Sequence, residues 1–232
     1  MRKSMSIVIF LVAGLIAAPA FARAEDKSEL QKRMREAEQV LKMSVTAPDK
    51  GIPKELLERA ECVGVFPGVA KGAFVVGGEF GRGVFTCRGR DGAMGPPAFF
   101  SIGGPSVGWQ FGGNVADFVL LIMNENGVKH LLQDHFTLGG EVSAVAGPVG
   151  RTVQAATDLQ LHAEILSWSR SRGLFLGASL KGTVINHDEK AARLFYGREV
   201  PAREILVDHA VPVPAAAQGY VKAVTQYSKR AS

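Results

Sequence analysis

The stretch ECVGVFPGVAKGAFVVGGEFGRGVFTC, residues 61–87, decides the fold. Its short apolar runs are punctuated by glycine, a texture that is typical of strands rather than helices. The segment is therefore expected to form a strand, a turn and a returning strand. Because Cys62 and Cys87 flank this unit, they are expected either to form a disulfide or to stay as two buried thiols. A zinc site is not expected, since no histidine lies near them at ligand spacing.

Strand patterns continue toward the C-terminus. Apolar and small or polar residues alternate over residues 107–111, which indicates a strand with one buried face. Residues 118–123 are apolar without alternation and predict a central strand that is covered on both sides. Residues 165–168 and 174–184, joined by a turn at 169–173, are expected to form a hairpin.

Glycine is unusually abundant in this chain. The 27 glycines among 232 residues follow no collagen-like period, and the weakly repeated glycine-ended strands are too irregularly spaced for a solenoid or propeller. A sheet that needs glycine where its strands bend accounts for them better. The predicted fold class is α+β, with a glycine-rich curved antiparallel β-sheet or partly closed barrel flanked by short α-helices.

Helical periodicity lies on both sides of the strand-rich region. Residues 27–45 predict an amphipathic helix whose apolar stripe contains Leu30, Met34, Ala37 and Leu41. Further short helices are expected after Pro53, around residues 128–135, from a cap at Asn186 or Asp188 to a stop at Gly197, over residues 201–207, and over the alanine-rich residues 215–229.

The N-terminus has the pattern of a secretory signal peptide. Arg2 and Lys3 precede an almost entirely apolar run over residues 6–18, and Ala20-Phe21-Ala22 supplies a small-x-small cleavage site. A retained membrane anchor is the weaker alternative, because the apolar run is shorter than a spanning helix needs. The protein is therefore expected to be exported, to the periplasm or the extracellular space, where it is peripheral on a membrane or free of it.

The chain then divides into four parts: the signal peptide at 1–22, amphipathic helices at 23–61, a β-rich domain at 62–207, and a linker with a C-terminal helix at 208–232.

Several blocks together resemble the SYLF family of lipid-binding domains. They are the stretch from Glu61 to Val84, Ala98-Phe-Phe-Ser-Ile-Gly-Gly, Gly108-Trp-Gln-Phe-Gly-Gly, Leu138-Gly-Gly, Ala146-Gly-Pro-Val-Gly, Ser167-Trp-Ser-Arg-Ser-Arg-Gly-Leu and Tyr196-Gly. The resemblance implies a module that binds phospholipid or phosphoinositide, and some fungal members also bind actin. It carries over no catalytic residues. For an exported chain, a general anionic phospholipid is the expected ligand.

The candidate lipid-binding residues combine cations with an apolar stripe. The cations are Lys71, Arg82, Arg170, Arg172 and Lys181, and the stripe is Leu30, Met34 and Leu41. Three cations near an anionic surface contribute only ~3 kcal/mol, so inserted apolar side chains would have to add to the affinity. The same stripe is equally typical of a helix packed on a sheet.

The remaining function classes find little support. The net charge of +5 does not demand nucleic acid, and neither a phosphate-binding loop nor a dinucleotide fingerprint is present. No cofactor and no metal are expected. His162 and Glu164, expected on one face of a strand, would be the acid–base pair of an enzyme, but the sequence favours non-catalytic binding. The alternative function is a structural protein of the cell envelope that binds a protein partner through the first helix and residues 215–229.

Overall fold

The computed structural model describes residues 26–47, 51–72, 77–106, 114–150, 162–171 and 174–230. The expected signal peptide, the strand expected at residues 107–111 and the candidate cation Arg172 lie outside these residues. These three features therefore stay predictions from the sequence.

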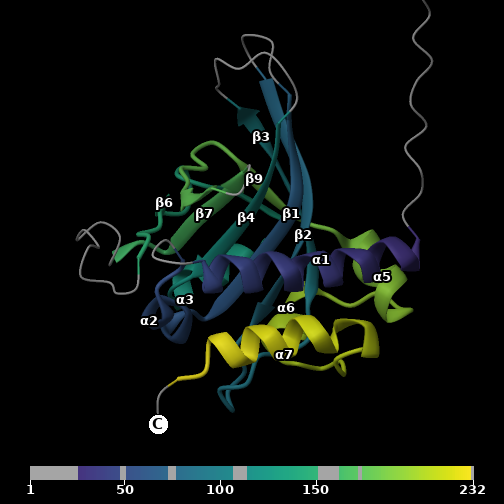
Figure 1. Cartoon of the computed structure of the whole chain (residues 1–232). Coiled ribbons are helices and arrows are strands. Elements are labelled where there is room, and N and C mark those ends of the chain that lie inside the picture. The colour runs from purple at the N-terminus through teal and green to yellow at the C-terminus, as the bar shows by residue number, and fades with distance from the viewer. Residues whose placement is uncertain are drawn as a thin grey trace, which may run out of the picture.

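A single curled sheet forms the centre of the protein (Figure 1). Its strands within the described residues are β1 (Cys62–Gly72), β2 (Gly77–Cys87), β3 (Ala98–Ser106), β4 (Asn114–Ile122), β5 (His135–Thr137), β6 (Ala144–Ala146), β7 (Ile165–Ser171), β8 (Leu174–Gly177) and β9 (Val184–His187). They are ordered β5-β9-β3-β2-β1-β4-β7-β6, and β8 also pairs with β7. The predicted α+β class with a curved sheet is confirmed. The pairing is antiparallel except between β6 and β7, which are parallel.

Hairpin β1–β2 has the form that the opening stretch predicts. Cys62 lies directly opposite Cys87 in the register. Their sulfur atoms are bonded at 2.03 Å, and both residues are buried. The expected disulfide is confirmed, and the alternative of two free thiols is wrong.

Helices cover one face and the edges of the sheet. They are α1 (Lys27–Thr46), α2 (Lys54–Arg59), α3 (Glu125–Leu131), α5 (Glu189–Tyr196), α6 (Ala202–Leu206), the 3₁₀ turn η2 (Ala215–Ala217) and α7 (Gln218–Tyr227). Figure 1 shows α1 and α7 lying across the same face of the sheet. Helix α5 begins at Asp188, whose carboxylate accepts the N–H of Ala191, and ends at Gly197 in the left-handed conformation with φ 75°.

The apolar stripe of α1 belongs to the core. Leu30, Met34 and Leu41 are at most 1% exposed and pack among the residues of the central hydrophobic cluster. Folded in this way they cannot reach an acyl chain, so the proposal that they insert into lipid is corrected in favour of packing on the sheet. The burial of these three side chains contributes roughly several kcal/mol to the stability of the fold.

The apolar face of α7 is buried in the same layer. Tyr220 is 1% exposed and donates its hydroxyl to the backbone carbonyl of Val63 at 3.2 Å. Because α1 and α7 pack against each other, the faces that the envelope-protein alternative needed for a partner are already occupied.

Aromatic rings fill the other face of the sheet, and glycine makes room for them. Phe85 makes edge contacts with Phe66 and Phe100 at centroid distances of 5.7 and 5.1 Å. A Cβ atom on Gly83 would lie 2.4 Å from the ring of Phe66, and one on Gly64 would lie 2.2 Å from the ring of Phe85. At these positions glycine is required by the neighbouring ring rather than by a bend of the strand.

Three local predictions differ from the structure. The hairpin expected over residues 165–184 stops at β8, since β9 pairs with β3 and β5 instead. His135 lies in β5, because α3 ends at Leu131. His162 and Glu164 precede β7 rather than share a strand, and the Glu164 carboxylate accepts the backbone N–H of Ser143 at 2.7 Å.

Candidate functional site

Figure 1 shows strands β1, β2 and β4 continuing beyond α1. The register of these three strands places an apolar row across them. Ala70 lies opposite Phe80 on one side and opposite Val115 on the other, so the three side chains share one face. Phe80 is 57% exposed and Val115 is 59% exposed. We call Phe80, Ala70 and Val115 the distal row. It is an apolar strip on the central strands of the sheet.

Charged side chains lie beside the distal row on the same face. Arg82 stands two residues from Phe80, and its guanidinium is 6.0 Å from the centre of the Phe80 ring. On the other side, Arg170 lies opposite Asp117, and their side chains are 3.5 Å apart. Asp117 also accepts the backbone N–H of Gly68 at 3.0 Å. The predicted cations Arg82 and Arg170 therefore lie near opposite ends of the distal row, both in the next row of side chains toward Cys62.

Lys71 is directed to the opposite face. Its ammonium group lies 3.1 Å from the carboxylate of Glu79 and 4.7 Å from the centre of the Phe118 ring. The side chain of Glu79 is 4% exposed and also accepts the hydroxyl of Thr183 at 2.8 Å. Since Lys71 balances this buried carboxylate, its charge is not available to the distal row, which corrects its assignment as a lipid-binding residue.

Lys181, the remaining predicted cation within the described residues, is exposed in the turn before β9. The structure thus brings together two of the predicted cations and separates Lys71 from them.

A cleft that the sequence analysis did not predict lies next to Arg82. One cavity of about 340 Å³ is lined by Phe80, Arg82 and Ser101 on the sheet and by the start of α5. It adjoins a second cavity of about 380 Å³, and both are lined by His187, Glu189 and Lys190.

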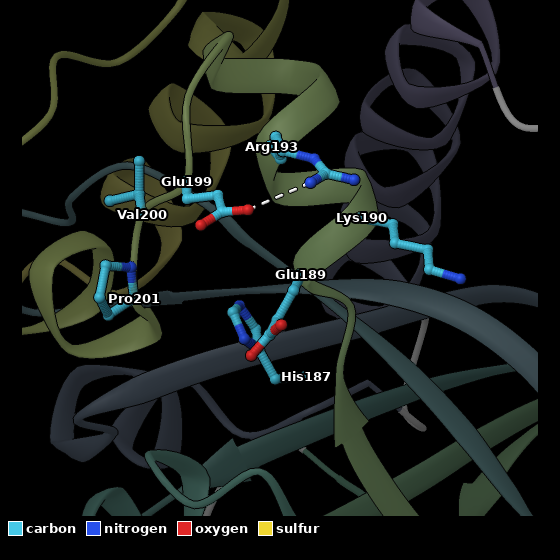
Figure 2. A pocket seen from close by; sticks show the side chains of 7 residues that line it. All are labelled: His187, Glu189, Lys190, Arg193, Glu199, Val200 and Pro201. Carbon is cyan, nitrogen blue, oxygen red and sulfur yellow. Dashed lines mark hydrogen bonds and ion pairs between the residues drawn. The ribbon is translucent and has the colours of Figure 1, made fainter.

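Figure 2 shows the second cavity. His187 and Glu189 enter it from the end of β9 and the start of α5, opposite Val200 and Pro201. Arg193 and Glu199 form an ion pair of 3.1 Å at its rim.

Two basic groups near the cleft are affected by burial. Burial lowers the pKa of the Arg33 guanidinium to about 10, with Asp188 opposing the shift, and this group lies 5.6 Å from the centre of the Phe99 ring. Burial also lowers the pKa of His187, although Glu189, Asp188 and Asp134 act in the opposite direction. His187 is therefore neutral at pH 7, and its Nε2 atom is buried with no hydrogen-bond partner in the described part of the chain.

The described residues offer neither a metal site nor a membrane-spanning helix. The described ranges contain no group of three or more histidine, cysteine, aspartate or glutamate side chains placed to hold a metal ion. Within those ranges, the helices are too short or too polar to cross a bilayer.

The sequence did carry a signal for part of this surface. Phe80 and Arg82 alternate with glycine in the stretch Glu79-Phe80-Gly81-Arg82, so period-two reasoning places both on one face. It could not show that this face extends beyond α1, nor that α5 folds back beside Arg82, because both depend on long-range packing.

Comparison with known proteins places the chain in a family. A family model described as "Las17-binding protein actin regulator" (Ysc84) matches residues 103–227. The yeast "LAS seventeen-binding protein 3" of Saccharomyces cerevisiae is 33% identical over 193 residues, which cover 82% of this chain and 42% of that protein. The human "SH3 domain-containing YSC84-like protein 1" is 28% identical over 209 residues, which cover 88% of this chain and 60% of that protein.

The chain thus spans roughly half the length of these relatives. The family model matches more than half of the chain, and the yeast relative aligns with most of it. Together with the blocks that begin in hairpin β1–β2, these matches show that the chain belongs to the Ysc84 family of SYLF domains.

Proposed function

We propose that the protein binds anionic phospholipid at a membrane surface, without catalysis, through the distal row and the cations beside it. The observation that carries this proposal is the exposure of Phe80 and Val115 on central strands, where a sheet residue would normally be covered. An apolar row with Arg82 and Arg170 beside its two ends offers groups for both layers of a bilayer surface, the acyl chains and the charged headgroups.

The energies show why both components are needed. A cation near an anionic surface contributes about 1 kcal/mol, and Asp117 offsets part of the charge of Arg170. Full burial of one large apolar side chain contributes about 1.5–3 kcal/mol. Phe80 and Val115 inserted together would therefore exceed the electrostatic attraction, which would leave a binding that depends only partly on salt.

Membership of a family of SYLF domains supports lipid as the ligand, since the chain resembles lipid-binding domains over most of its length. The name of the yeast LAS seventeen-binding protein 3 refers to binding of Las17 by that protein.

We propose further that the protein is exported and acts in the periplasm or outside the cell. Two observations support this location. The first 22 residues have the pattern of a signal peptide, and Cys62 and Cys87 form a disulfide, which is the usual state of cysteine pairs outside the cytosol. In that compartment a bulk anionic phospholipid is a more accessible ligand than a cytoplasmic phosphoinositide.

Vesicle co-sedimentation tests the binding proposal. The purified protein should pellet with vesicles of phosphatidylglycerol and phosphatidylcholine more than with phosphatidylcholine alone. Phe80→Ala should weaken binding to the anionic vesicles about tenfold, since it removes most of one buried apolar side chain.

Met43→Ala is the matched control, because Met43 is an exposed apolar residue on α1, away from the distal row. Negligible pelleting with both vesicle types would refute the function. Equal losses in the two variants would refute the assigned surface.

A further inference from the structure

The cavity beside Arg82 carries charges of both signs in a small volume. Arg82 and Lys190 bring two cations and Ser101 brings a hydroxyl group, while Asp188 and Glu189 bring two carboxylates. We call this cavity of about 340 Å³ the headgroup cleft. A simple anion placed in it would meet two carboxylates, and a simple cation would meet an arginine and a lysine. The lining is complementary to a ligand that itself carries both charges.

The two carboxylates differ in the contacts that they make within the protein. Asp188 already accepts the N–H of Ala191 as the cap of α5. Glu189 follows it in the first turn, is exposed, and makes no ion pair or hydrogen bond with the residues that the structure describes. It is thus the carboxylate that a ligand can engage. His187, which lines the same cleft, supplies a neutral imidazole as a second acceptor.

We infer that the headgroup cleft binds a phosphoethanolamine group, with its phosphate held by Arg82, Ser101 and Lys190 and its primary ammonium held by Glu189. Guanidinium groups match phosphate oxygens with two parallel hydrogen bonds, and a carboxylate is the natural partner of an ammonium group. The inference rests on the proposed function, since it makes phosphatidylethanolamine the lipid that this membrane-binding protein recognises. It adds a selective contact to the general attraction of an anionic surface.

The size and position of the cleft agree with a headgroup rather than a whole lipid. About 340 Å³ lies near the lower limit of small-molecule sites, which is enough for a headgroup and too little for two acyl chains. Phe80 is part of both the cleft and the distal row. A headgroup in the cleft would therefore place its glycerol and acyl chains over the exposed ring of Phe80.

The chemistry of the amine provides the test. An ethanolamine ammonium can donate hydrogen bonds to Glu189, whereas the quaternary ammonium of choline cannot. Vesicles with a fixed fraction of phosphatidylglycerol, the rest being either phosphatidylethanolamine or phosphatidylcholine, differ only in that group. The protein should bind the ethanolamine vesicles about tenfold more tightly, the change expected from one charge-assisted hydrogen bond.

Matched variants assign this preference to the cleft. Glu189→Gln should abolish the preference for ethanolamine over choline. Glu125→Gln should retain it, because Glu125 is likewise an exposed glutamate in the first turn of a helix but lies on α3. Similar affinities of the unaltered protein for both vesicle types, or loss of the preference in both variants, would overturn the inference.

A soluble probe separates this inference from the proposed function. In NMR titrations, glycerophosphoethanolamine should shift the amide signals of Ser101 and Glu189, and inorganic phosphate at the same concentration should shift them much less. Equal shifts with the two probes, or none with either, would overturn the inference even if anionic vesicles still bind. Shifts with glycerophosphoethanolamine alone, in a protein that ignores all vesicles, would sustain the cleft and refute the membrane function.

Discussion

The two ends of hairpin β1–β2 differ although one pair of strands forms both. At one end Cys62 and Cys87 are bonded, and Phe66 and Phe85 are completely buried. At the other end Phe80 is more than half exposed, and Ala70 beside it is exposed as well. The end with the disulfide carries the stability of the fold, and the distal end presents an apolar surface that folding does not use.

From this difference we expect the exposed ring of Phe80 to contact something outside the chain. A buried ring stabilises a protein through its neighbours, whereas an exposed ring on a central strand contributes little to folding. If this is correct, substitutions at the two ends must separate stability from binding.

The largest separation is expected between two phenylalanines. Phe66→Ala should lower the free energy of unfolding by about 4 kcal/mol, because it leaves a cavity beside the ring of Phe85. Phe80→Ala should change it by no more than about 0.5 kcal/mol. Urea unfolding followed by circular dichroism measures both. A loss of stability in Phe80→Ala close to that in Phe66→Ala would remove the distinction between the two ends.

The disulfide should give the next largest effect. Replacing Cys62 and Cys87 together by serine should lower the free energy of unfolding by about 3 kcal/mol, since the bond closes a loop over a sequence separation of 25 residues. Urea unfolding in oxidising buffer compares the double variant with the unaltered protein. Vesicle binding of the folded variant should be unchanged; weaker binding would mean that the distal end depends on the bonded end.

Two glycines of β2 form a matched pair. Gly83→Ala would bring a Cβ atom to 2.4 Å from Phe66 and from the carbonyl oxygen of Val65, and it should destabilise by about 2 kcal/mol. Gly78→Ala would place the nearest atom, the carbonyl oxygen of Gly104, at an ordinary 3.8 Å and should be within about 0.5 kcal/mol of neutral. Thermal unfolding of both variants compares them, and similar melting temperatures would contradict the idea of tight ring packing around Gly83.

The smallest effect concerns pH. His187 is the last residue of β9. Burial lowers its pKa from 6.5, so the unfolded chain binds a proton at this residue more readily than the folded chain does. The free energy of unfolding should therefore fall as the pH drops through 6.5 toward the lower folded pKa. Urea unfolding at pH 7.5 and 5.5 should show a smaller decrease in His187→Asn than in the unaltered protein. An equal decrease in His187→Asn and in the unaltered protein would contradict this assignment.

Local patterns were sufficient for much of the fold. The two paired strands within residues 61–87, the central strand β4 and the capped helix α5 follow from short-range signals, and the structure contains each of them. The positions of the two cysteines left a disulfide and two buried thiols as alternatives, and the structure contains the disulfide. The partners of β9 could not be predicted from local patterns. Ile185 pairs with both Ile102 and Phe136, and no local pattern specifies such distant pairing.

The candidate site was predicted less well. Residue type identified Arg82 and Arg170, but it could not distinguish them from Lys71, which is bound to a buried glutamate. The apolar stripe of α1 has the same periodicity whether it meets lipid or a sheet, and only the presence of β1 beneath it decides. The headgroup cleft forms between elements far apart in the chain, so its carboxylate Glu189 and its arginine Arg82 share no sequence motif.

Tyr220 donates its hydroxyl to Val63, and the guanidinium of Arg88 donates to the carbonyl of Ser228 at 2.9 Å, across 140 residues. Strand β1 and helix α7 are thus joined although they lie far apart in the chain. A contact between such distant segments closes a long loop, so the part of the fold that depends on it is expected to form late in folding.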